Sequence, residues 1–461
     1  MAYNYNMHTS SRVAIIGGGV SGLAAAKHLA RHHPQVFEAS DSIGGVWRKC
    51  TYETTKLQSV RVSYELSDFL WPNRGESSFP TYVDVLDYLE AYAKHFNLVK
   101  FIKFNSKVVE LRFIGDGKTL QMGDLGAYGN LLPGKPVWEV AVNTGDGDIQ
   151  WHAFEYVVVC AGKYGDVPRT PTFPVKKGPE IFKGKVLHSM DYCKLQKEKA
   201  SQLLHGKKVA VIGFKKSAID LALESALANQ GIIYIYIYIY IFFTGKEGKT
   251  CTVGRATVSK FIESYVLWKL PLEKYGLKPD HAFEEDYASC QMALVPEKFF
   301  EEADKGMIRF KRTTNWWFYD EGIEFEDGTT LEADVVILAT GYDGMKKLKA
   351  IVPEPFRSWL EFPWGIMPLY RGTIHPLIPN MGFIGYVQSS SNLKSSELHS
   401  RWLSQLLDGK FTLPSKEKML DQFLKEMHVM RRSSRFFKNH CFSTFSIQHA
   451  DDLSKDMNLK P

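Results

Sequence analysis

The chain has 461 residues, which is room for two or three domains of ordinary size. Hydrophobic residues make up 44% of it and charged residues 23%, a composition that excludes a disordered, collagen-like or coiled-coil protein. The formal net charge of +6 is too small for this length to indicate a nucleic-acid partner.

The cysteines and the apolar segments give expectations about the environment of the protein. The six cysteines contain no CxxC and no zinc-ligand spacing, so the sequence predicts neither a disulfide framework nor a metal site. No secretory leader pattern opens the chain, and no apolar run reaches the roughly 18 residues that a membrane span needs. We therefore expect a cytoplasmic protein without a transmembrane segment.

The first motif is a strand, a glycine turn and a helix. Residues 12–16 (RVAII) run into GGGVSG and then into LAAAKHLARH. In this pattern the glycines permit a tight turn, a close approach to a pyrophosphate and close helix packing. The next strand, QVFEA, carries an acid 21 residues after the first glycine, where a ribose-binding carboxylate is expected. A ligand-free structural turn is the alternative. The candidate nucleotide-binding residues are Gly17, Gly18, Gly19, Val20, Ser21, Gly22 and Glu38.

The segment after Glu38 adds a second glycine pair and then the rest of the first unit. Gly45, Val46 and Trp47 follow Gly44, at a place where the backbone could pass near a bound cofactor. Residues 107–142 read as a β-meander, and 155–165 as a buried parallel strand that ends at small residues. Cys160, at the end of that strand, is interpreted as a packing residue rather than a nucleophile.

A second strand, turn and helix begin at Lys207. KKVAVI precedes a GxGxxA pattern in which Lys215 replaces the middle glycine. A 2′-phosphate would require a cation after the next strand, and Arg255 follows the strand-like CTVG. The Ile/Tyr run lengthens this span, so the stretch Ile232–Gly245 is interpreted as an insertion. The candidate residues of this second site are Gly213, Phe214, Lys215, Lys216, Ser217, Ala218 and Arg255.

The last third completes the predicted architecture. A hairpin turns at Asp327-Gly328, a buried strand covers 334–338, and covering helices are expected at 397–407 and 416–432. The predicted fold class is α/β, with two Rossmann-like dinucleotide-binding domains, the second inserted in the first. The predicted boundaries are 1–175 and 343–461 for the first domain and 176–342 for the second.

One further motif points to a family. The pattern FxGxxxHxxx(Y/F) is matched by Phe182, Gly184, His188 and Tyr192. With the two glycine turns and the Ala-Thr-Gly-Tyr sequence at 339–342, the chain resembles the flavin-containing monooxygenases, which are class B flavin monooxygenases. The segments 56–72, 213–220 and 389–403 look most similar to the plant branch that contains the pipecolate N-hydroxylase.

The resemblance implies FAD at the first turn and NADPH at the second. It implies hydride transfer to the flavin, capture of O2 as a C4a-hydroperoxyflavin, and oxygenation of a small amine or sulfur substrate, for example a pipecolate-like cyclic amine. His188 would be structural, with a catalytic base as the alternative. Gln58 occupies the place of an asparagine found in many relatives near the flavin and is the candidate catalytic residue.

Two departures from the family pattern lead to a competing hypothesis. The Ile/Tyr run lies within the NADPH-binding unit, and relatives carry several dozen more residues after the position of Arg255. The chain is therefore either an active N- or S-oxygenase or a degenerate FAD-binding pseudoenzyme, the product of a decaying gene. A disulfide reductase of the same fold would need a redox CxxC, which the sequence lacks.

Overall fold

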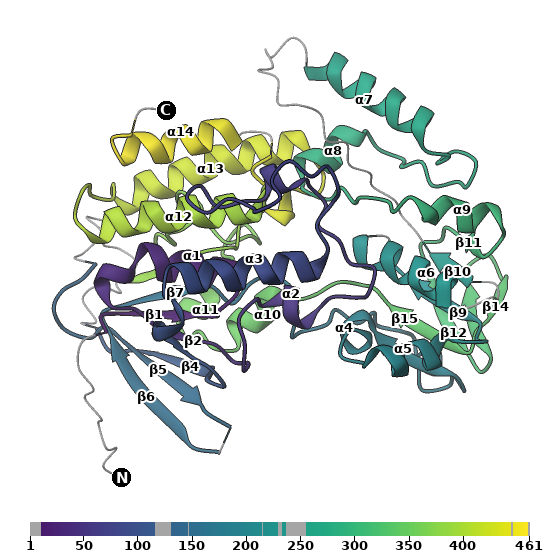
Figure 1. The fold of residues 1–461 in the computed structure, drawn as a ribbon, viewed down its shortest axis with the longest axis horizontal. Coiled ribbons are helices and arrows are strands. Elements are labelled where there is room, and N and C mark those ends of the chain that lie inside the picture. The colour runs from purple at the N-terminus through teal and green to yellow at the C-terminus, as the bar shows by residue number, and fades with distance from the viewer. Residues whose placement is uncertain are drawn as a thin grey trace.

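In the computed structural model, two parallel sheets lie side by side and helices cover them (Figure 1). The structure describes residues 11–115, 131–145, 147–213, 215–228, 233–236, 255–443 and 446–459. The α/β architecture with two Rossmann-like units is confirmed.

The first sheet is parallel and buried on both faces. Its strand order is β16-β7-β1-β2-β3, and Ile15 of β1 pairs with Val36 and Val158. Successive side chains of a strand point to opposite faces of the sheet, so neighbouring residues of β1 pack in two different hydrophobic clusters, one on each face. The strands are β1 (Val13–Ile16), β2 (Gln35–Phe37), β3 (Ile102–Lys103), β7 (Tyr156–Val159) and β16 (Met381–Phe383).

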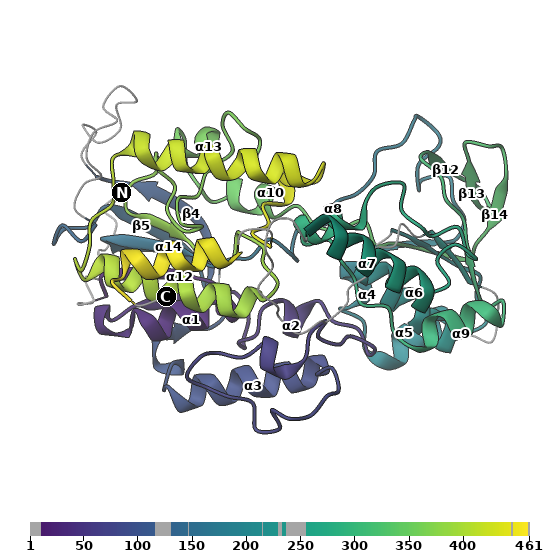
Figure 2. The ribbon, with the colours of Figure 1, turned by 90° about the horizontal axis from the view of Figure 1, so that it is seen from above.

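Different elements cover the two faces of this sheet. Ile15 packs in a cluster with Ala25 and Trp402, whereas Ile16 packs in a cluster with Trp138 and Phe356. The helices on the first side are α1 (Val20–His28), α12 (Asn392–Leu407), α13 (Lys416–Ser433) and α14 (Ser446–Asp456), which Figure 2 shows from above. The second side carries α10 (Gly344–Lys349), α11 (Phe356–Trp359) and the predicted antiparallel meander, which consists of β4 (Lys107–Phe113), β5 (Trp138–Asn143) and β6 (Ile149–Phe154).

The second sheet is built by the residues between β7 and β16. Its order is β11-β10-β9-β15-β8, all parallel, and the chain then returns to the first sheet, where Met381 pairs with Val157. The second unit is therefore inserted in the first, as predicted, while the exact domain borders stay predictions. Its strands are β8 (Lys185–His188), β9 (Val209–Ile212), β10 (Ile233–Tyr236), β11 (Ile308–Phe310) and β15 (Val335–Leu338).

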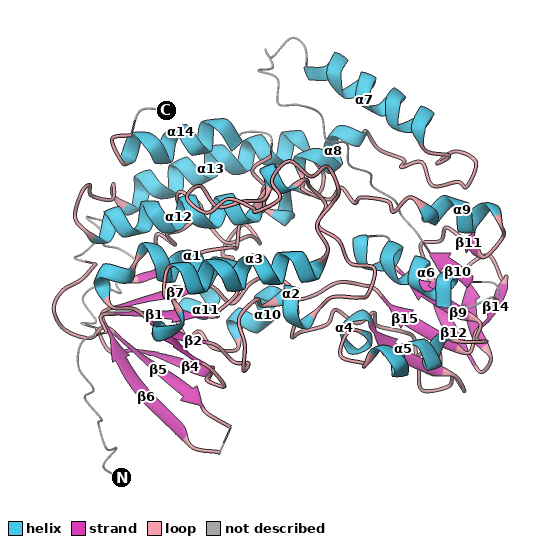
Figure 3. Cartoon of the chain, in the orientation of Figure 1, coloured by secondary structure: helices cyan, strands magenta, loops and turns pink. Residues whose placement is uncertain are grey.

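The faces of the second sheet are also covered differently. Val211 packs with Ile219 and Phe299 on the helical side, and Ile212 packs with Phe318 on the other side. The helices around this unit are α4 (Ser189–Tyr192), α5 (Lys197–Leu204), α6 (Lys216–Ala228), α7 (Arg255–Lys269), α8 (Phe283–Ala288) and α9 (Lys298–Asp304). The other side carries the antiparallel strands β12 (Trp316–Tyr319), β13 (Gly322–Phe325) and β14 (Thr330–Glu332), which Figure 3 shows in magenta.

The remaining helices are short or lie at the edge of the first unit. The helix α3 (Tyr82–His95) begins with a capping box between Thr81 and Asp84, and α2 (Val46–Lys49) follows the second glycine pair. Short 3-10 helices cover Ala30–His32, Arg61–Ser63, Val99–Phe101 and Phe437–Asn439. Among the described residues, no helix has the length and apolar character that crossing a membrane requires.

The strand β10 corrects one prediction. The composition of Ile232–Gly245 predicts an insertion, but Tyr234 pairs with Ala210 of β9 and with Arg309 of β11. An alternating apolar segment has the period of a strand, so the start of the Ile/Tyr run is able to occupy the second strand position of the unit. Residues 237–245 lie outside the described part of the chain.

Several buried histidines make the fold sensitive to acid. His399 and His449 approach within 2.9 Å through their Nε2 atoms between α12 and α14. Burial lowers the pKa of His399 to about 4 and that of His449 far below its usual value. Among the other histidines whose pKa is lowered mainly by burial, the large shifts are those of His28 and His375 (both to about 4) and His440 (to about 3).

We expect the free energy of unfolding to fall between pH 6.5 and 5. The unfolded chain protonates these five histidines below about pH 6.5 while the folded chain does not, so acid favours unfolding. Burial raises the pKa of Asp220 to about 6 and of Asp286 and Glu426 to about 7, which offsets three of these protons. Unfolding near pH 5 therefore takes up a net of roughly two protons. The free energy of unfolding then falls by on the order of 3 kcal/mol for each pH unit of acidification.

Urea unfolding at pH 6.5 and pH 5 measures this slope. His375→Gln should reduce it by about one proton, whereas replacing the exposed His205 with glutamine should leave it unchanged. Stability that is constant or rises over this interval would contradict the assignment of neutral buried imidazoles.

Candidate active site

One cavity of about 2450 Å³ opens along the carboxyl ends of both parallel sheets and reaches both glycine turns. Gly17 and Gly213, which follow β1 and β9, both line it. In α/β sheets, ligands bind outside the carboxyl ends of the strands. The volume is well above the roughly 300 to 1000 Å³ of ordinary small-molecule sites, so two large ligands fit.

The first turn has the backbone geometry of a phosphate cradle. Gly17 has φ +106°, and a Cβ atom on it would lie 2.7 Å from the carbonyl oxygen of Cys160. A Cβ atom on Gly22 would lie 1.8 Å from the carbonyl oxygen of Gly17, so helix α1 packs directly on the turn. Only glycine fits both positions, and the amino end of α1 faces the cavity through Gly19, Val20 and Ser21.

Glu38 is held rigidly beside this turn. Its Oε2 atom accepts a hydrogen bond from the Gly18 amide at 2.7 Å, and Oε1 accepts one from the Ser40 amide at 2.8 Å. The residue is 5% exposed and lines the cavity. Because each carboxylate oxygen has two lone pairs, the side chain still has acceptor capacity for a ribose hydroxyl.

The second glycine pair contacts the first turn. A Cβ atom on Gly45 would lie 3.2 Å from the Cα atom of Gly19, so the two segments touch through glycine. Val46 and Trp47 begin α2 and line the same cavity, with the Trp47 ring 6.2 Å from the Tyr64 ring. The structure thus brings the predicted residues of the first site together.

The turn after β9 repeats this geometry with added positive charge. Gly213 has φ +148°, and a Cβ atom on it would lie 2.4 Å from the carbonyl oxygen of Ala339. Lys215, Lys216 and Ser217 line the cavity, and Ala218 is fully buried under the sheet. Burial, together with the nearby Arg169, lowers the pKa of the Lys215 ammonium, so a bound anion would be favoured there. Phe214 lies outside the described residues.

The predicted 2′-phosphate contact is not placed by the structure. Arg255 is the first residue of α7, its side chain is outside the described part, and so is the expected strand at 251–254. Lys311 and Arg312 instead line the cavity where β11 ends, at the same edge of the sheet as Gly213. The sequence signal for them is a basic pair directly after the strand-like IRF, which the sequence analysis missed.

Gln58 connects the two units inside the cavity. Its side-chain oxygen accepts a hydrogen bond at 2.8 Å from the amide of Leu294, which belongs to the second unit, and Gln58 lines the cavity. The bond orients the carboxamide across the boundary between the two units. A direct role in catalysis stays a prediction.

The motif that carried the family resemblance lies under the cavity rather than on its wall. His188 ends β8, is 4% exposed, and accepts a hydrogen bond at 3.1 Å from the Met190 amide through Nδ1. Tyr192 donates a hydrogen bond at 2.8 Å to Glu224 of α6. His188 is not among the described residues that line the cavity, which favours its structural role. Phe182 packs on Phe318, and Gly184 directly precedes β8.

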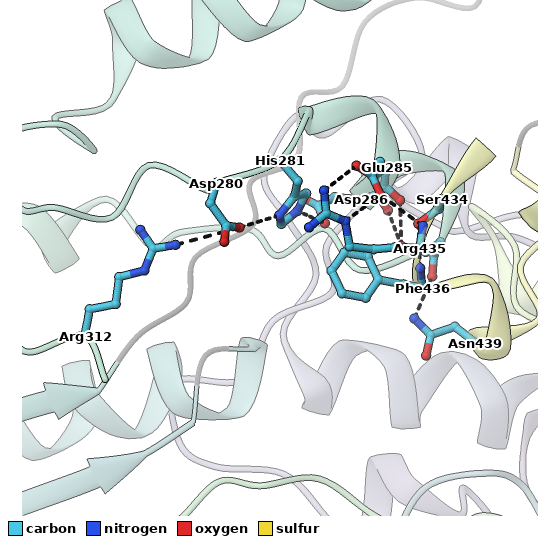
Figure 4. A network of polar contacts seen from close by, with 10 residues as sticks. Asp280, His281, Glu285, Asp286, Arg312, Ser434, Arg435, Phe436 and Asn439 are labelled. Carbon is cyan, nitrogen blue, oxygen red and sulfur yellow. Dashed lines mark hydrogen bonds and ion pairs between the residues drawn. The ribbon is translucent and has the colours of Figure 1, made fainter. Parts of the chain in front are cut away.

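Helix α8 attaches to the carboxyl-terminal part of the first unit through a polar network (Figure 4). Glu285 accepts hydrogen bonds from the backbone amide of Arg435 at 2.9 Å and from its Nε atom at 3.0 Å. Nearby, the buried His281 approaches Asp286 at 3.0 Å. These contacts fix one side of the boundary between the two units.

A disulfide reinforces this attachment and corrects the expectation that the cysteines stay unpaired. Cys290 and Cys441 are bonded, with their Cα atoms 5.7 Å apart and a sequence separation of 151. Local spacing cannot reveal such a pair, because only the tertiary fold brings the two segments together. In the described part of the chain, no group of three or more possible metal ligands occurs.

Comparison with known proteins agrees with this geometry. A family model described as flavin-binding monooxygenase-like matches residues 10–237 and 250–461. An Arabidopsis thaliana protein named as flavin-containing monooxygenase 2 is 94% identical over 473 aligned positions and covers all of both chains. Another, named as flavin-containing monooxygenase 1, is 72% identical over 499 positions and covers all of this chain and 94% of its own. A steroid monooxygenase bound to NADP has a TM-score of 0.68 at 18% identity, with 97% of each chain covered.

The comparisons also show where the chain differs from the family. The family model passes over residues 238–249, which follow β10, while β10 itself lies within the match. The alignment to the 72% identical relative has more positions than this chain has residues, so the relative carries residues that this chain lacks.

Proposed function

The chain belongs to the flavin-binding monooxygenase-like family, and from this we propose that it uses FAD, NADPH and O2 to oxygenate a small substrate at an amine nitrogen or a sulfur atom. The observation that carries the proposal is the single cavity that both glycine turns line. A pipecolate-like cyclic amine as substrate and a cytoplasmic location are part of the proposal.

The residues of the two turns fit the two cofactors. Gly17, Gly19 and Glu38 would hold the pyrophosphate and ribose of FAD, because a Cβ atom is excluded at Gly17, Gly19 lines the cavity, and Glu38 provides a fixed carboxylate. Gly213, Lys215 and Ser217 would hold the pyrophosphate of NADPH. When bound, the flavin and nicotinamide supply the hydride transfer and the oxygen chemistry.

The protein itself supplies position and a shielded cavity. Tyr52, Tyr164 and Tyr342 line the cavity, and burial raises the pKa of each above its usual value, that of Tyr164 to about 12. These phenols therefore stay protonated at neutral pH, so they are able to donate hydrogen bonds and do not act as bases. The hydrogen bond between Gln58 of the first unit and Leu294 of the second would hold the two proposed nucleotide sites in a fixed relative position.

We expect Lys311 and Arg312 to select NADPH over NADH. A 2′-phosphate near the carboxyl end of β11 would meet these two cations, and charge-assisted hydrogen bonds contribute about 1.5 to 3 kcal/mol each. Replacing both with alanine should raise KM for NADPH by at least about 100-fold and change KM for NADH less than about twofold.

Steady-state oxidation of the two nucleotides measures this selectivity. The matched control replaces two exposed lysines with alanine: Lys298, which begins α9, and Lys305, which directly follows it. This double variant removes the same charge from the same unit. Equal losses for NADPH and NADH, or an equal effect of the control, would place the 2′-phosphate elsewhere.

A second function, flavin binding without oxygenation, is favoured by one observation. The family model passes over residues 238–249, directly after the strand that borders the NADPH turn. Such a protein would bind FAD through the intact first turn but would accept no hydride from NADPH.

The test is product formation by the full-length protein. Purified flavoprotein is incubated with NADPH and O2 and a panel of small cyclic amines, amino acids and thioethers, and products are identified by mass. A product that is one oxygen atom heavier, formed with matching NADPH consumption, is the expected result. Flavin-loaded protein that yields no such product with any panel member would favour the second function.

A further inference from the structure

The boundary between the two units has a second cysteine pair, on segments that are packed against each other. Residues 50–54 follow α2, and residues 192–197 comprise the end of α4 and the segment after it. The Tyr52 and Tyr192 rings lie 6.1 Å apart, and Lys197 pairs with Glu53 at 2.9 Å. These contacts fix one cysteine of the first unit, Cys50, beside one of the second.

That second residue is Cys193. The thiols of Cys50 and Cys193 are free and half-buried, both residues line the cavity, and the Cys193 thiol donates a hydrogen bond at 3.2 Å to the Met190 carbonyl. Interaction with Cys193 lowers the pKa of Cys50, while interaction with Cys50 and burial raise the pKa of Cys193. The Cys50 thiolate is the stronger candidate nucleophile, because thiolates rather than thiols react with peroxides.

Cys160 provides an internal comparison. It also lies at the cavity, but it is 6% exposed and burial raises its pKa, so its thiol stays protonated. It has no cysteine partner in the described part of the chain. Buried, protonated thiols of this kind are chemically inert.

We propose that Cys50 and Cys193 form a site of oxidative modification, at which hydrogen peroxide converts the two thiols into a disulfide across the two units. The Cys50 sulfur displaces hydroxide from the peroxide, which gives a sulfenic acid and one water. The Cys193 sulfur then attacks the sulfenic sulfur, which forms the S–S bond and releases a second water. Two thiols lose two electrons and two protons, and the peroxide takes them up.

The new bond would cross the boundary at a different place from the existing disulfide. Cys290–Cys441 already joins the segment after α8 to the carboxyl-terminal part of the first unit. With both bonds formed, the second unit would be covalently linked to the first at two places. The oxidation of the two thiols does not depend on the proposed function. Only one possible source of the hydrogen peroxide, its release by this protein as an oxygenase, rests on that function.

The experiment treats the reduced, desalted full-length protein with a few equivalents of hydrogen peroxide. Remaining thiols are alkylated, and peptides are mapped by mass without reduction. We expect a peptide pair linked through Cys50 and Cys193 to form in addition to the Cys290–Cys441 pair, with Cys160 alkylated only after denaturation. Because the readout needs neither flavin nor NADPH, its failure is separate from failure of the proposed oxygenase.

Two variants keep the test decisive. Cys160→Ser should leave the link intact, and Cys50→Ser should abolish it and slow the loss of Cys193 thiol at least tenfold. Both are compared by circular dichroism with the parent protein. Cys50 oxidised to sulfinic acid without a link, a link to Cys160 or to another molecule, or an unreactive Cys50 would each overturn the proposal.

Discussion

Replacing Gly17 with alanine is expected to yield a protein that purifies with less than about a tenth of the parent flavin. The alanine would have to adopt φ near +106° and would place Cβ 2.7 Å from the carbonyl oxygen of Cys160. Backbone strain of this kind costs about 1 to 3 kcal/mol, and the clash adds to it. A total of about 3 kcal/mol corresponds to a flavin affinity roughly 100-fold weaker.

The absorbance ratio of flavin to protein measures the effect. Gly409→Ala is the matched control, because Gly409 also has positive φ, +69°, but open space where the Cβ would lie. The Gly409→Ala control has the backbone strain of a positive φ but no steric clash, so it should keep its flavin. A Gly17→Ala protein with full flavin content would show that the cofactor does not depend on the turn after β1.

Gly213→Ala is expected to keep its flavin and to lose reduction by NADPH, with a rate at least about 100-fold lower. Its Cβ would lie 2.4 Å from the carbonyl oxygen of Ala339, so the turn must move away from β15. A displacement of this size shifts the nicotinamide relative to the flavin, and hydride transfer requires close alignment of the two rings. The first sheet contains none of these residues, so the FAD site is untouched.

Stopped-flow reduction without oxygen measures this rate. Gly306→Ala serves as the control in the same unit, with φ +75° and open space at the Cβ position. Equal rates for Gly213→Ala and the parent protein would exclude the turn after β9 as the NADPH site. Loss of flavin from Gly213→Ala would show instead that the two units do not fold independently of each other.

The parts of the site that the sequence predicts are those encoded over short spans. The turn at Gly17, the acid at Glu38 and the turn at Gly213 each lie within a strand, a loop and a helix that follow one another in the chain. Their spacing is set by the backbone geometry of one βαβ unit, so pattern and structure agree. The inserted arrangement of the second unit follows from the same local patterns taken in order.

Most features that the sequence does not predict depend on distant segments. Cys290 meets Cys441, and Gln58 meets Leu294, only because the second unit packs on the first. The Ile/Tyr run was taken for an insertion because its composition is unusual, yet its alternation is compatible with a central strand. The unusual composition marks the Ile/Tyr run in the sequence. The hydrogen bonds of β10 to β9 and β11 show which of its described residues belong to the sheet.

The central claim is that one cavity holds both cofactors and passes a hydride between them. The most direct measurement adds NADPH to the purified flavoprotein without oxygen and follows the flavin band near roughly 450 nm. We predict that the band bleaches with one equivalent of NADPH and returns when oxygen is admitted. A flavin that stays oxidised at saturating NADPH would contradict the account and leave a protein that binds FAD alone.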